Sequence, residues 1–125
     1  MKKQAAIVFT PISQEEMALF ITRAFRALTP RSGFKNGEIY YDLTVEEGQP
    51  VVIRVYTSIS PSGMSASRGA DAIRVGLFST SGRPLKAGKL PIVKRTQNWR
   101  DNLRRLIEDE IEDYHDKEDY WNSRA

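Results

Sequence analysis

Basic and aromatic side chains occupy alternating positions in the three central segments of this 125-residue chain. In a β-strand, alternate residues point to opposite faces, so these side chains are expected to share one face of a sheet. The residues predicted on that face are Tyr40, Asp42, Arg54, Tyr56, Arg74 and Phe78, with Lys94 as a further candidate. Aromatic rings stack on nucleobases, at about 1–3 kcal/mol per base, and guanidinium groups bind phosphates. The pattern therefore indicates binding of single-stranded nucleic acid, since a protein that reads a duplex more often presents a helix.

Two loops carry further cations beside this face. Residues 60–70 are rich in Ser and Gly and contain Arg68, whereas residues 80–89 contain three basic residues. In an antiparallel meander these loops lie at opposite ends of the sheet, where they are expected to clamp a bound strand. The predicted nucleic-acid-binding residues are Tyr40, Arg54, Tyr56, Arg68, Arg74, Phe78, Arg83, Lys86, Lys89 and Lys94.

Charge is segregated along the chain. Residues 1–105 hold 17 Lys and Arg against 8 Asp and Glu, a net charge of +9. Residues 106–125 hold 2 basic and 8 acidic residues, a net charge of −6. A basic body predicts a polyanionic partner. The acidic end predicts either competition with nucleic acid for the basic face or contact with a partner protein.

Other interpretations of the same residues stay open. Outward Tyr and Phe side chains also suit cross-strand packing, and such a face also suits the interface of a homo-oligomer. A protein-interaction module, such as an accessory or inhibitor protein acting on a nucleic-acid enzyme, would carry a similar charge. A small metal-independent ribonuclease that relies on Arg, Lys and Tyr is a third hypothesis.

The residues required for most catalytic and metal chemistry are missing. The chain has no Cys and a single His, His115, which lies among acidic residues. No phosphate-binding glycine motif or serine-nucleophile elbow is present. The only strand-associated carboxylates in the basic body are Glu38, Asp42 and Asp71. We therefore predict no catalytic residue, no metal and no cofactor.

A helix is predicted over residues 14–28, where Ser13 and Glu16 have the spacing of a capping box. Thr29-Pro30 ends it. Between Gly33 and Gly37 the Asn-Gly pair indicates a tight turn. Period-two alternation then predicts strands over residues 38–45, 51–59, 71–79 and 90–96.

A second helix is predicted over residues 97–117, followed by a tail over 118–125. Apolar residues from Trp99 to Tyr114 keep helical spacing. Its charges have the wrong sign for the helix dipole, with Arg100, Arg104 and Arg105 near the start and acidic residues later. This polarity indicates that a requirement other than helix stability placed the charges.

These elements predict a single α+β domain over residues 1–125. It is a two-layer sandwich, in which an antiparallel sheet of three to five strands carries the N-terminal and C-terminal helices on one face. The other face is expected to be open to solvent. No apolar run is long enough to span a membrane, and the absence of Cys favours the cytoplasm.

Overall fold

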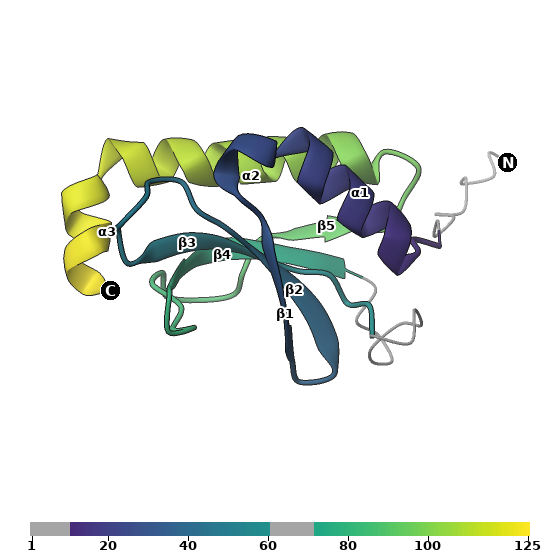
Figure 1. The fold of residues 1–125 in the computed structure, drawn as a ribbon, viewed down its shortest axis with the longest axis horizontal. Helices are drawn as coiled ribbons and strands as arrows, with labels where there is room; N and C mark the ends of the chain where they lie inside the picture. The colour runs from purple at the N-terminus through teal and green to yellow at the C-terminus, as the bar shows by residue number, and fades with distance from the viewer. Residues whose placement is uncertain (1–10, 61–71) are drawn as a thin grey trace, which may run out of the picture.

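Five strands that follow one another along the chain form one antiparallel sheet, in the order β1-β2-β3-β4-β5 (Figure 1). The computed structural model describes residues 11–60 and 72–125. The strands are β1 (Arg31–Lys35), β2 (Glu38–Leu43), β3 (Val51–Tyr56), β4 (Ala72–Ser79) and β5 (Ile92–Lys94). The helices are α1 (Gln14–Ala24), the short 3₁₀ helix η1 (Arg26–Leu28), α2 (Trp99–Asp116) and α3 (Glu118–Arg124).

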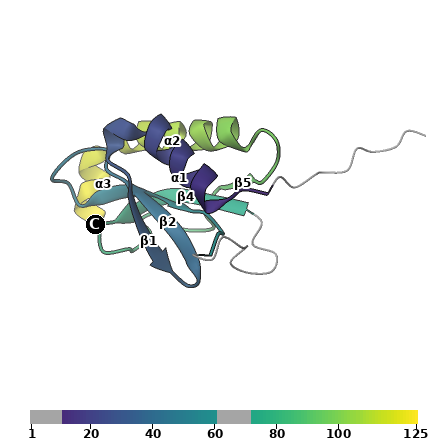
Figure 2. The ribbon, with the colours of Figure 1, turned by 45° about the vertical axis from the view of Figure 1, so that its right-hand side comes forward.

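Both long helices cover the same face of the sheet (Figures 1 and 2). The hydrophobic core lies between these helices and the sheet. It contains aliphatic residues of β3 and β4, such as Ile53 and Val75, and helix residues such as Ile21, Leu103 and Ile107. The predicted α+β architecture with helices on one face is therefore confirmed. We call the sheet face turned away from α1 and α2 the outer face.

The capping box at the start of α1 is present. Ser13 Oγ accepts a hydrogen bond from the Glu16 backbone N–H at 3.0 Å, and Glu16 Oε1 accepts one from the Ser13 backbone N–H at 3.2 Å. Two orphan amide groups of the helix start are satisfied in this way. The α-helix ends at Ala24 and continues as η1, so the helix predicted over 14–28 contains one α-helical and one 3₁₀ segment.

Strand β1 was not predicted. Gly33 to Gly37 was expected to be a turn, but only Asn36 and Gly37 turn the chain, both with positive φ (52° and 85°). The residues before them pair with β2, so that Gly33 lies opposite Tyr40. Three other strands are shorter than the sequence indicates: the segments predicted over 38–45, 51–59 and 90–96 end as strands at Leu43, Tyr56 and Lys94, whereas β4 ends at Ser79 as predicted.

The C-terminal tail is a helix that belongs to the core. Trp121 is 7% exposed, whereas its neighbour Tyr120 is 50% exposed. The Trp121 indole N–H donates to the Asp113 carbonyl at 3.2 Å, and Arg124 Nε donates to the Leu85 carbonyl at 3.1 Å. Helix α3 therefore ties the end of α2 to the segment that follows β4. In the part of the chain that is described, no helix has the length and apolar character needed to cross a membrane.

Replacing the two adjacent aromatic residues of α3 tests this attachment. Trp121→Ala removes a buried side chain and is expected to lower the free energy of unfolding by about 3 kcal/mol. Tyr120→Ala is the matched control and should change it by about 0.5 kcal/mol or less. Urea unfolding followed by circular dichroism measures both values. Equal effects of the two variants would show that α3 is not part of the core.

Candidate functional site

The strand register brings the predicted sheet residues onto one face. Tyr56 lies opposite Tyr40 on one side and opposite Arg74 on the other. The ring centroids of Tyr40 and Tyr56 are 5.8 Å apart, and those of Tyr56 and Phe78 are 5.7 Å apart, both edge to face. The prediction that these side chains share a face is confirmed, and they form a second apolar cluster on the outer face together with Val52.

Arg54 lies at the centre of this cluster and is only 4% exposed. Its Nε and Nη2 atoms donate to the two carboxylate oxygens of Asp42 at 2.8 and 3.1 Å. Its Cζ lies 3.9 Å from the centroid of the Tyr40 ring. Burial lowers the pKa of Arg54, but hydrogen bonds and charge from Asp42 and Tyr56 outweigh it, and the net pKa is raised. Arg54 is therefore a fixed cation whose charge is neutralised inside the protein.

The chain itself covers this part of the outer face. Pro84 forms a β-bridge with Phe78, and Leu90 packs on the cluster. Gly76 allows the close approach of Leu90, because a Cβ there would lie 2.6 Å from the Leu90 Cδ2 atom. The expectation of a solvent-open face is thus wrong for Arg54, Tyr56 and Phe78, all of which are buried. The alternation of these residues along the strands predicts correctly which face of the sheet they share. It cannot show that the segment containing Pro84 and Leu90 folds over that face.

Arg74 is half-buried and has an acidic partner of its own. Its Nη2 group donates to Glu38, whose other oxygen accepts the Ser58 backbone N–H at 2.8 Å. The Arg74 Cζ lies 4.9 Å from the centroid of the Tyr56 ring. A guanidinium has five N–H donors, so the partly exposed Arg74 keeps donors for a ligand.

The predicted loop cations divide into two groups. The acidic helix α2 holds Lys86: the ammonium group lies 3.0 Å from Glu110 and also pairs with Asp113. Burial lowers the pKa of Lys86, but the hydrogen bonds and charges of these carboxylates raise it by more. Arg83 donates to the Arg124 carbonyl at the C-terminus.

Lys86 and Arg83 are thus held by the C-terminal helices. The contacts of Lys86 with Glu110 and Asp113 are of the kind expected if the acidic end competes with nucleic acid for basic residues. Lys89 and Lys94 are exposed and have no ion pair with any described residue. Arg68 lies outside the described residues, as does Asp71.

One row of outer-face residues is covered only in part: Tyr56 is buried, but Tyr40 and Arg74 are partly exposed. Directly opposite residues point to the same side of a sheet, so Tyr40, Tyr56, Arg74 and Ile92 form a line across β2 to β5. We call these four residues the open row. Ile92, at its β5 end, is 54% exposed.

A lysine lies beside the open row on each edge strand. Lys94 lies opposite Ala72 on β5, and Lys35 lies opposite Glu38 on β1; both lysines are exposed. Sequence reasoning missed Lys35 because the residue was assigned to a turn. Recognising residues 31–35 as a strand before the Asn-Gly turn would have identified it.

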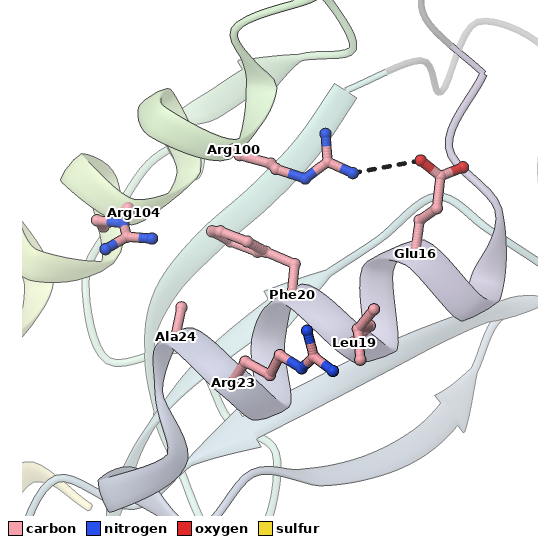
Figure 3. A pocket seen from close by; sticks show the side chains of 7 residues that line it. All are labelled: Glu16, Leu19, Phe20, Arg23, Ala24, Arg100 and Arg104. Carbon is pink, nitrogen blue, oxygen red and sulfur yellow. Dashed lines mark hydrogen bonds and ion pairs between the residues drawn. The ribbon is translucent and has the colours of Figure 1, made fainter.

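A second basic surface lies on the helical layer. A groove of about 520 Å³ runs between α1 and the first half of α2 (Figure 3). The residues that line it are Glu16, Leu19, Phe20, Arg23, Ala24, Arg100 and Arg104. Glu16 pairs with Arg100 at 3.3 Å, and the Arg104 Cζ lies 5.8 Å from the Phe20 ring centroid. Leu19 is 50% exposed. The groove thus joins an apolar floor to three guanidinium groups.

Comparison with known proteins gives no family assignment: no protein-family model, curated protein or solved structure matches this chain. Within residues 11–60 and 72–125, no three His, Cys, Asp or Glu side chains are grouped so that they could hold a metal ion.

Replacing Asp42 tests how strongly the buried Arg54 depends on its carboxylate partner. Asp42→Asn removes the negative charge and leaves a buried guanidinium uncompensated, so the free energy of unfolding should fall by about 3 kcal/mol. Glu16→Gln breaks the exposed pair with Arg100 and should cost about 0.5 kcal/mol. Urea unfolding at neutral pH compares the two. If Asp42→Asn proved as mild as Glu16→Gln, Arg54 would not depend on its carboxylate partner.

Proposed function

We propose that the protein binds single-stranded nucleic acid along the open row of the outer face and catalyses no reaction on it. The observation that carries this proposal is the position of Lys35 and Lys94 at opposite edges of an aromatic and guanidinium row. Neither lysine has an acidic partner among the described residues. Four inter-strand spacings of about 4.8 Å separate the edge strands that carry the two lysines, so these strands are about 19 Å apart, and the open row between β2 and β5 is about 14 Å long. That length suits a few nucleotides of a strand lying across the sheet.

Each part of the row has a distinct role in this proposal. Lys35 and Lys94 bind phosphates, and Arg74 binds a phosphate with the donors that Glu38 leaves free. Tyr40 and Ile92 are the partly exposed apolar contacts for bases. Arg54, Tyr56 and Phe78 support the row from within and do not themselves contact the ligand, because they are buried. Lys89 adds charge near the β5 edge.

The charge distribution supports the same surface. Most exposed carboxylates belong to the second half of α2 and to α3, and α3 lies at the end of the molecule away from β5 (Figure 1). A phosphate chain is therefore attracted toward the β5 side and repelled from the α3 side. The acidic half of α2 is left for a protein partner. We propose the cytoplasm as its location, because the chain has no Cys and disulfides are rare there.

Salt dependence of binding tests the proposal. Titration of fluorescent oligo-dT and oligo-U with wild-type protein should show affinity that falls steeply with salt. Lys94→Ala and Lys35→Ala should each weaken binding to both oligonucleotides and reduce the slope of log K against log salt by about 0.7, the value for one contact to a single-strand phosphate.

Lys117→Ala is the matched control, because it removes the same charge from an exposed position at the acidic end. It should leave the slope unchanged. If all three lysine variants lose affinity equally, the binding is unspecific attraction and the open row is not the site. Tyr40→Ala tests base stacking separately, and an affinity equal to wild type would limit the site to phosphate contacts.

A further inference from the structure

The exposed charges of α2 have opposite signs in its two halves. Arg104 and Arg105 in the first half are exposed and have no ion pair with a described residue. Glu108, Asp109, Glu112 and Asp116 in the second half are likewise exposed and unpaired among the described residues. Of these residues only Asp116 lies in a terminal turn, where the helix dipole disfavours its charge. A partner with the opposite charge at each half would compensate the exposed charges.

The groove described above lies beside the basic half of α2. On the α1 side it offers Arg23 and the half-exposed Leu19, and on the α2 side Arg100 and Arg104, with the Phe20 ring between the two helices (Figure 3). Among the described residues, Arg100 is the one of these three arginines with a carboxylate partner, Glu16. An acidic helix would find both charge and apolar contact here.

We propose that this helix is the second half of α2 from another copy of the chain, in a two-fold symmetric dimer. Arg104 and Glu112 lie four residues before and after Glu108, so residues 104, 108 and 112 are neighbours on one side of the helix. When two α2 helices pair in opposite directions around residue 108, Arg104 of each copy meets Glu112 of the other. The two Glu108 side chains meet near the symmetry axis, where Arg104 and Arg105 of both copies flank them.

The self-complementary pattern favours a second copy over an unrelated acidic protein. An unrelated acidic helix would neutralise the groove but leave the four exposed carboxylates of α2 without partners. A second copy pairs Arg104 and Glu112 in both directions at once, and a two-fold interface closes on itself instead of extending into a filament. This proposal goes beyond nucleic-acid binding and does not depend on it, because α2 covers the face of the sheet opposite to the open row.

Charge-reversal variants test the dimer. The mass of the wild-type protein, measured by sedimentation velocity over a range of concentrations, should be that of a dimer at low salt and shift toward monomer at high salt. R104E and E112R should each raise the dimer dissociation constant at least about tenfold, since each creates two symmetric like-charge contacts. The double variant R104E/E112R should regain the dimer, because it exchanges the partners of both pairs.

Mixing the two single variants is the decisive measurement. In a dimer of one R104E chain with one E112R chain, both contacts are again between opposite charges, so an equimolar mixture should dimerise although neither component does so alone. K94E is the control: it changes the net charge as R104E does, but it lies on β5 and should leave the dimer intact. Circular dichroism confirms that each variant is folded.

A wild-type protein that stays monomeric at low salt overturns the proposal. So does a dimer that R104E and E112R leave unchanged, or a double variant and a mixture that both remain monomeric. None of these outcomes decides whether the open row binds nucleic acid, because K94E should bind oligonucleotides more weakly than wild type whether or not the chain dimerises. The two proposals therefore stand or fall separately.

Discussion

The buried ion pair of Arg54 and Asp42 is the constraint on which the outer face depends. A guanidinium taken almost completely out of water is tolerated only where a carboxylate and further hydrogen-bond acceptors replace the water. Asp42 meets this need from the neighbouring strand, and the Tyr40 ring stacks against the guanidinium. The 80–91 segment then covers the pair, so the sheet has helices on one side and a partial cover of loop on the other. The part of the outer face that a ligand can reach is the part that the 80–91 segment does not cover.

Nearby carboxylates determine whether an Arg or Lys side chain forms an internal ion pair or stays available to bind a ligand. Arg54 and Lys86 each lie within hydrogen-bonding distance of a carboxylate and are partly or wholly withdrawn from solvent. Lys35 and Lys94 have no such neighbour among the described residues and remain hydrated. A phosphate can bind lysines such as Lys35 and Lys94 without displacing an internal ion pair. The net charge of the basic body therefore overstates the charge available for binding, because part of it is already neutralised within the molecule.

Sequence patterns predicted those features of the fold that local spacing controls. The capping box at Ser13, the strand faces and the stripe of α2 all follow from periods of 3.6 or 2 residues, and the structure confirms them. Strand β1 was missed because Gly33 and a short length concealed its alternation. The cover over Arg54 was missed because it depends on contacts between Leu90 and Gly76, which no local period reports. Helix α3 was taken for a tail because its burial rests on one side chain, Trp121.

The two proposed surfaces are compatible because they lie on opposite layers. Pairing through α2 buries the helical layer between the two copies and leaves both outer faces directed away from the interface. It also neutralises Glu112 and its exposed acidic neighbours, which otherwise repel a phosphate chain that approaches the molecule. A dimer of this kind presents two open rows, and two linked sites on one nucleic-acid strand bind more tightly than one when the strand can span both. The opposite charges of the two halves of α2 would then be explained by the assembly.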